Sequence, residues 1–115
     1  MAIQTVTLRN LMVDQYKAQC THVALYSTVP AASAGTELTG GSPAYARRVA
    51  NWGATASSAA TASPAAHDVP SGATVAGAGF HSAITAGNYL DGGSVTSQAF
   101  ASQGTYTVTA TYTQT

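Results

Sequence analysis

The sequence predicts an all-β fold, a small antiparallel β-sandwich with one short N-terminal α-helix. Apolar residues show helical spacing near the start of the chain, and from about residue 21 onward they alternate with a two-residue period in several short segments. Turn residues separate these segments at intervals of roughly 8 to 15 residues, a spacing typical of sandwiches. The length of 115 residues suits a single domain, which we place at residues 1–115.

The helix is expected over residues 7–17, where Thr7 can cap the first turn. Residues at helical spacing form its apolar stripe, namely Leu8, Leu11, Met12 and Tyr16. A stripe of this kind can cover an open end of the sandwich or dock on a neighbouring protein.

The first strand is expected over residues 21–27, followed by a loop over 28–43 that is rich in Pro, Gly, Ser and Ala. A second strand is expected over 44–52, although neither of its sides is wholly apolar. The run over 54–66 contains mostly Ala, Ser and Thr and is interrupted by Pro64. Its composition fits a strand of small residues and a mobile surface loop equally well.

A further strand is expected over residues 74–81, where Gly77 and Gly79 indicate a bulge or the close approach of another backbone. The clearest strand lies over 105–113, because threonines alternate there with Tyr, Val and Ala. One face of this strand is therefore apolar and the other carries hydroxyl groups.

Between these two strands the turn residues predict a hairpin. Ala86-Gly87-Asn88 should connect Ala83-Ile84 to Tyr89-Leu90. A second turn is expected at 91–94, leading into a strand over 95–100.

Charged residues are scarce, at 7% of the chain, and the formal net charge is +0. The surface must therefore consist of Thr, Ser, Gly, Gln and Ala, which are easily desolvated, and a neutral protein tends to associate. We expect much of this surface to be buried against other subunits. Four basic residues are too few for a nucleic-acid interface, and no stretch has the roughly 20 apolar residues needed for membrane insertion.

Residues 1–20 contain Arg9, Asp14 and Lys17 where the apolar segment of a signal peptide should lie. We therefore expect synthesis in the cytoplasm without a signal peptide. Cys20 is the sole cysteine, which excludes an intrachain disulfide and a cysteine-based metal cluster.

No enzymatic activity, cofactor or metal site is expected. The runs at 40–44 and 92–96 lack the last glycine of a nucleophile elbow. General acid–base catalysis normally needs two placed titratable groups, but the four acidic residues are scattered along the chain. The histidines, at positions 22, 67 and 81, have no metal-binding spacing.

Aromatic and hydroxyl side chains offer two binding alternatives. Trp52 and the six tyrosines could stack on sugar rings, but a single Trp in a small sandwich more often anchors the packing. We expect Tyr26, Tyr106 and Tyr112 to fill the core. The threonine row over 105–113 resembles ice-binding surfaces, yet no other segment repeats it, so a solvated or partner-facing strand is favoured.

The adjacent cations Arg47 and Arg48 form the only charge pair in the sequence. One interpretation is that one side chain is exposed and the other is paired within the chain. The other interpretation is an intersubunit ion pair with Glu37 or Asp91. We take these four residues as predicted intersubunit contacts.

Four segments carry a resemblance to a known family: Thr21–Tyr26, Gly35–Arg47, Ala78–Ala83 and Gln103–Tyr106. They are similar to segments of short virion proteins of tailed bacteriophages, which are labelled tail-fibre, minor tail or minor capsid proteins. The most specific element is the run Gly-Gly-Ser-Pro-Ala-Tyr-Ala-Arg at Gly40–Arg47. The resemblance implies a structural part of a phage particle, made in the host bacterial cytoplasm, with other virion proteins as its partners.

Two locations in the particle are compatible with this resemblance. A decoration or minor capsid subunit would clamp neighbouring capsid subunits in many copies. A tail or tail-fibre component would be present in few copies and could serve as a receptor-binding or glycan-binding adhesin. We favour the capsid, because the chain has neither the long repeats of a fibre shaft nor a convincing ligand platform.

Overall fold

A computed structural model describes residues 2–115 and confirms the β-rich fold with an N-terminal helix. Within these residues the helix precedes eight strands, and the paired strands run antiparallel. The elements are α1 (Val6–Gln19), β1 (His22–Tyr26), β2 (Arg48–Val49), β3 (Ala59–Thr61), β4 (Ala65–Val69), β5 (Thr74–His81), β6 (Tyr89–Ala99), β7 (Gly104–Val108) and β8 (Thr111–Thr113).

One layer is a four-stranded sheet with the order β2-β1-β5-β6. Strand β1 lies inside this sheet, and its residues from Val23 to Tyr26 are buried. The strands predicted over 21–27 and 74–81 are confirmed by β1 and β5.

The hairpin between β5 and β6 differs in part from the prediction. The turn expected at 86–88 is present, but Ala83-Ile84 lies outside the strands, and residues 91–94 continue β6 instead of turning. Gly92 pairs with Gly79 across the ladder. Gly92, which suggested a turn, therefore serves here as a small strand residue beneath the segment that contains Pro30.

The other layer is a ribbon that is two strands wide. Along it, β3 pairs with β8 and β4 pairs with β7. The register shifts by one residue between these two ladders, so the strand predicted over 105–113 is interrupted at 109–110. Its threonines are exposed and its Tyr, Val and Ala side chains are half-buried, as the alternation predicted. The run over 54–66 contains β3 and the start of β4, so a strand of small residues occupies part of it.

The segment over 44–52, predicted as one strand, forms only β2 and isolated bridges at Ala44 and Trp52. Val49 pairs with His22 in the first sheet, whereas Trp52 pairs with Ala62 in the ribbon. The segment thus crosses from one layer to the other and closes one edge of the sandwich. A chain that changes layers bends at the crossing, which is why a single straight strand does not form.

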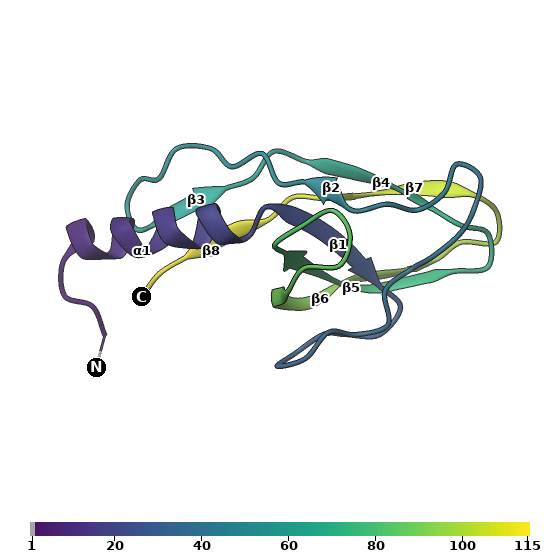
Figure 1. The fold of residues 1–115 in the computed structure, drawn as a ribbon, viewed down its shortest axis with the longest axis horizontal. Coiled ribbons are helices and arrows are strands. Elements are labelled where there is room, and N and C mark those ends of the chain that lie inside the picture. The colour runs from purple at the N-terminus through teal and green to yellow at the C-terminus, as the bar shows by residue number, and fades with distance from the viewer. Residues whose placement is uncertain (1) are drawn as a thin grey trace.

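The hydrophobic core lies between the two layers and consists of Leu25, Leu38, Val69, Val75 and Phe100. Figure 1 shows β4 and β7 along one side of the molecule and β5 and β6 along the other. The molecule is elongated, with principal extents of 48 × 25 × 24 Å. A thin core suits the few large aliphatic residues of the sequence.

Helix α1 begins earlier than predicted, because Thr5 is the cap in place of Thr7. The Thr5 hydroxyl accepts a hydrogen bond from Leu8 N at 3.2 Å. At the other end Cys20 N donates to Tyr16 O at 2.9 Å, after the helix has passed its predicted end at residue 17.

The face that α1 turns inward is not the one predicted. Val13 is fully buried, and Tyr16 stacks on Tyr112 of β8 with ring centroids 3.7 Å apart. The other three members of the predicted stripe, Leu8, Leu11 and Met12, are 47%, 59% and 44% exposed. The burial of Val13 and the aromatic contact of Tyr16 together set the rotation of the helix, and this rotation turns those three side chains outward.

The segment after β1 crosses the outer face of β5 and β6, where glycines make room for it. A Cβ atom on Gly77 would overlap Pro30 Cδ, and one on Gly92 would lie 2.7 Å from Pro30 Cγ. The close backbone approach predicted at Gly77 is therefore confirmed. Tyr89 anchors the same segment by donating to Ala31 O at 2.7 Å.

We predict that Gly77→Ala lowers the free energy of unfolding by about 1–3 kcal/mol, because the new methyl group overlaps the rigid Pro30 ring. Gly93→Ala is the matched control, since a Cβ there meets no atom within 4 Å. Urea denaturation of both variants measures the difference. Equal stability of the two variants would contradict the tight contact.

Candidate functional site

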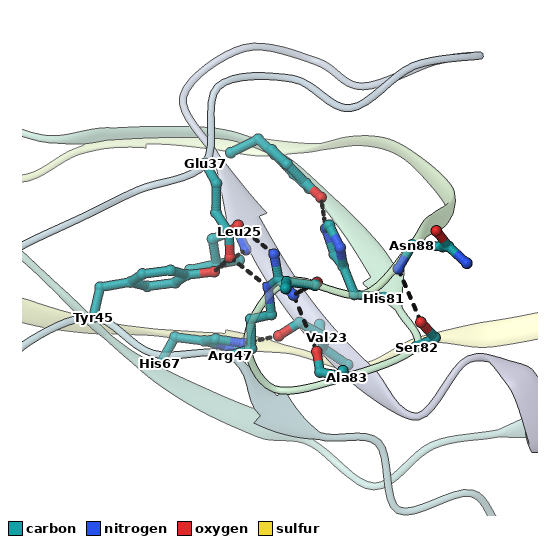
Figure 2. Close-up of polar contacts among 12 residues, drawn as sticks. Val23, Leu25, Glu37, Tyr45, Arg47, His67, His81, Ser82, Ala83 and Asn88 are labelled. Carbon is teal, nitrogen blue, oxygen red and sulfur yellow. Dashed lines mark hydrogen bonds and ion pairs between the residues drawn. The ribbon is translucent and has the colours of Figure 1, made fainter.

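The carboxylate of Glu37 lies at the centre of a polar cluster, which Figure 2 shows. Arg47 binds it twice, from Nε to Oε2 at 2.9 Å and from Nη2 to Oε1 at 2.8 Å. Tyr45 donates to Oε2 at 2.7 Å, and its hydroxyl accepts from Leu25 N at 3.0 Å. We call Glu37, Tyr45 and Arg47 the Glu37 cluster. Its bidentate geometry fixes both charged side chains.

The run Gly40–Arg47 reaches Glu37 by turning back on itself. Gly40 and Gly41 have φ angles of +85° and +97°, a left-handed conformation that favours glycine. Tyr45 N donates to Gly40 O at 2.8 Å and closes the turn. Tyr45 and Arg47 are two residues apart, so an extended chain points both toward Glu37.

Arg47 also holds the loop between β5 and β6. Its Nη1 donates to Ala83 O at 3.0 Å and to Ala86 O at 2.7 Å. Burial alone would raise the pKa of Glu37, but the hydrogen bonds from Arg47 and Tyr45 hold that pKa below its usual value. The bonds to Glu37 raise the pKa of Arg47. Both groups are therefore charged across the ordinary pH range.

Next to the Glu37 cluster, His81 of β5 hydrogen-bonds through Nε2 to the hydroxyl of Tyr26 in β1. Burial lowers the pKa of His81; Arg47 lowers it further, whereas Glu37 opposes the shift. Burial also raises the pKa of Tyr26 to about 12. Both side chains are buried, so the pair acts as a neutral contact inside the protein.

His67 of β4 is fully buried and donates from Nε2 to Val23 O at 3.0 Å, joining the ribbon to the sheet. Burial lowers its pKa. His22 is half-buried and bonds to the Thr21 hydroxyl at 2.9 Å. Within residues 2–115, no group of three or more His, Cys, Asp or Glu side chains is placed to hold a metal ion.

The residues predicted as intersubunit contacts lie in contacts within one chain. Arg47 pairs with Glu37, while Arg48 Nη2 pairs with Asp68 Oδ2 at 3.0 Å. Asp91 accepts a hydrogen bond from Tyr16 at 2.6 Å. Their role between subunits stays a prediction. The sequence did not reveal that Asp68 is the partner of Arg48, because this ion pair depends on β2 lying beside β4.

Trp52 takes part in an aromatic cluster that holds α1 against the body of the protein. Its indole Nε1 donates to Cys20 O at 2.9 Å, and its ring lies 5.3 Å from that of Phe80. Tyr16 meets Trp52 edge-on at 5.9 Å. The packing interpretation of Trp52 therefore accounts for its contacts. Of the tyrosines expected in the core, Tyr26 is buried, whereas Tyr106 and Tyr112 are half-buried.

Apolar side chains nevertheless reach the surface in several places. Those on α1 are Val6, Leu8, Leu11 and Met12, and those elsewhere are Val29, Val49, Ile84 and Leu90. The threonine row of β7 and β8 is exposed beside them. The surface is thus composed of hydroxyl and apolar groups with little charge.

Several grooves cross this surface, and three of them adjoin the elements described above. One of about 280 Å³ runs between β6 and the ribbon, and its floor includes Phe80, Val95 and Val108. A second, of about 250 Å³, lies beside α1. The third, of about 430 Å³, lies between the Glu37 cluster and the β5–β6 loop that carries Ile84. None of them gathers reactive side chains beyond those already described.

Comparisons with protein-family models, with curated proteins and with solved structures find no match to this chain. In the part of the chain that the structure describes, no helix has the length and apolar content needed to cross a membrane.

We predict that Arg47→Met lowers the free energy of unfolding by about 2–3 kcal/mol, because it leaves the half-buried Glu37 carboxylate without its cation. Arg48→Met is the matched control and should cost about 0–1 kcal/mol, since the Arg48–Asp68 pair is more exposed. Urea denaturation gives both values. Equal losses would contradict a special role for the Glu37 cluster.

We predict that acid weakens the fold through His67 and His81. Both have lowered pKa values when folded, so below pH about 6.5 the unfolded chain binds more protons than the folded one. Stability then falls with falling pH, by up to about 1.4 kcal/mol per pH unit for each histidine.

The measurement is urea denaturation between about pH 7 and pH 5, above the range in which Glu37 titrates. His67→Gln and His81→Gln should each reduce the slope, and His22→Gln is the matched control at the third histidine. A slope that neither buried variant changes would show that other groups cause the acid sensitivity.

Proposed function

We propose that this chain is a non-enzymatic structural subunit of a tailed-phage virion, namely a minor capsid or decoration protein. The observation that carries the proposal is the nature of its surface. The charged side chains are scarce, and six of the eight form ion pairs within the chain. The surface that the chain can offer to a partner therefore consists mainly of apolar and hydroxyl groups.

The open edges of the sandwich support the same proposal. Strand β6 ends its sheet, and β7 and β8 each pair with one strand only. Unpaired edges and exposed apolar residues are liabilities in an isolated protein but are useful where neighbours cover them. A virion presents many identical neighbours, and burial against them stabilises the folded chain by mass action.

The resemblance to phage virion proteins agrees with this proposal and suggests the particle in which the subunit would assemble. Its most specific run, Gly40–Arg47, supplies Tyr45 and Arg47 to the Glu37 cluster. That run therefore has a structural reason for its sequence, because it holds the loops around β1 and β5. A protein of this kind acts through its shape and its contacts.

The alternative is a tail or tail-fibre component, including a receptor-binding or glycan-binding adhesin. We favour the capsid because the only tryptophan is engaged in packing and in a bond to Cys20 O, which leaves no free aromatic platform at that position. A decoration protein also needs no ligand pocket, and it exploits the long axis of 48 Å to bridge adjacent subunits.

Quantitative mass spectrometry of purified virions encoding this chain tests the proposal. We predict many copies per particle, which remain with the capsids when capsids and tails are separated. A handful of copies in the tail fraction would favour the alternative location. Complete absence from purified particles would refute a virion role.

A further inference from the structure

The groove of about 280 Å³ between β6 and the ribbon follows two strand edges, and we call it the edge groove. It touches the consecutive residues Asp91–Val95 of β6 and Val108–Tyr112, from the end of β7 into β8. Neighbouring residues of a strand point to opposite faces, so a groove that touches every one of them runs along the main chain. On this side neither edge pairs with another strand of residues 2–115.

The floor of the edge groove is the core-facing side of the sheet. It includes Val23, Ala78 and Phe80. Ala78 and Val95 pack against the core, and Gly93 pairs with Ala78 across the ladder, so these three residues face the same side. A Cβ atom on Gly93 would meet no atom within 4 Å. The space above Gly93 is therefore open and can take a side chain from elsewhere.

Side chains bridge the two edges beyond both ends of this stretch of β6. At its start, Tyr16 donates to Asp91 Oδ2 at 2.6 Å and stacks on Tyr112 of β8. Just past its end, the Tyr106 hydroxyl of β7 donates to Thr96 O at 2.6 Å. The groove between these bridges is about five residues long, or roughly 17 Å of extended chain.

The main-chain groups of β6 that face the groove are identified by their contacts. Gly92 N donates to Asp91 Oδ1 at 2.9 Å, a bond that takes the place of pairing with a further strand. Ser94 is two residues from Gly92, so its N–H and C=O point to the same side of the strand. Because β6 is the last strand of its sheet, these groups of Ser94 face the groove without a partner strand.

Asp91 gives the edge groove a negative charge. Of the residues that line the groove, it alone is charged. It pairs with Phe80 across the ladder, so its side chain lies on the side of the groove floor. Its hydrogen bonds come from Tyr16 and Gly92, which are neutral donors, and no cation of residues 2–115 pairs with it. The groove therefore complements an occupant that carries a cation.

We propose that the edge groove binds an extended peptide segment of another protein, and that this segment carries a lysine or arginine. The segment pairs with β6 in the antiparallel sense of the other ladders and becomes the fifth strand of the four-stranded sheet. Its main chain bonds to Ser94 and Gly92, and its cation lies opposite Asp91. Main-chain bonds supply affinity in this mode of binding, and alternate side chains supply specificity.

The register fixes the side-chain pattern of the segment. Residues opposite Val95, Gly93 and Asp91 point to the floor, because directly opposed residues share a face. Residues opposite Ser94 and Gly92 point to the outer face. An antiparallel segment therefore reads, from its N-terminus, apolar, any residue, apolar, any residue and then lysine or arginine. The central apolar side chain enters the open space above Gly93.

This inference goes beyond the proposed function, because it requires only the purified chain and a peptide. Peptide binding by a chain that is absent from virions would refute the virion role alone. A chain that is abundant in virions but binds no peptide of this pattern would refute this inference alone.

Amide NMR of the purified protein with the capped peptide Val-Thr-Val-Thr-Lys tests the binding. We expect a dissociation constant of about 0.1–1 mM, with shift changes concentrated at residues 91–96 and 108–112. The absence of shift changes at about 5 mM peptide, or changes centred elsewhere, would overturn the proposal.

Two N-methylated peptides test the main-chain pairing on the unaltered protein. Methylation of the first threonine removes the N–H that faces Ser94 and should weaken binding at least about tenfold. Methylation of the central valine is the matched control, because that N–H points away from β6 and its loss should cost less. An equal or greater loss for the valine would overturn the pairing with β6.

A side chain placed in the groove should compete with the peptide. Gly93→Leu fills the open space and should weaken binding at least about tenfold. Ser94→Leu is the matched control, because Ser94 pairs with Gly77 and points to the outer face. Thermal melts by circular dichroism verify that both variants are folded. If either is unfolded, the methylated peptides decide the question; folded variants with equal affinity would overturn the site.

Asp91→Asn tests the charge while keeping an oxygen that can accept from Tyr16. It should weaken binding of the lysine peptide about threefold and leave binding of a peptide with methionine in place of lysine unchanged. The same effect on both peptides would overturn the role of Asp91 as the partner of the cation.

Sedimentation equilibrium without peptide tests the choice of occupant. We expect a monomer whose edge groove is free. A dimer that the peptide dissociates would overturn the proposed partner, because a second copy of the chain would then occupy the groove.

Discussion

The ion pair between Glu37 and Arg47 is the interaction on which the arrangement of the loops depends. It joins the segment beside β1, the run that begins at Gly40 and the loop between β5 and β6. A core this small cannot hold long loops by apolar burial alone. One bidentate ion pair with further hydrogen bonds fixes them instead, and it does so in a chain with only eight charged residues.

Alternation along the chain predicted those strands that lie within a single layer. The hydroxyl and apolar faces of 105–113 and the strands at β1 and β5 were readable, because burial on one face imposes a period of two. The structure of the segment over 44–52 could not be predicted in this way, because the segment changes layers between Val49 and Trp52. The turn predicted at 91–94 was also wrong, because the sequence does not distinguish a strand glycine that makes room for Pro30, such as Gly92, from a glycine in a turn.

The candidate site could be predicted only in part. Arg47 and Glu37 were two of the four charged residues predicted as intersubunit contacts, but the sequence does not say which of the four pair, or whether an ion pair forms within one chain or between two. The partners of Arg48 and Asp91 come from β4 and α1, so they depend on the packing of layers that local patterns do not encode. The helix shows the same limit, because spacing identified an apolar stripe, but the side that faces inward carries the buried Val13 and Tyr16, which stacks on Tyr112.

The strand pairing of the ribbon constrains the order in which the two layers can fold. Strands β3 and β4 find their partners only in β8 and β7, which are translated after the whole of the first sheet. Strands β3 and β4 therefore stay unpaired until the residues that follow β6 have been added. The waiting strands consist largely of alanine with few bulky apolar residues, a composition that limits their tendency to aggregate on the ribosome.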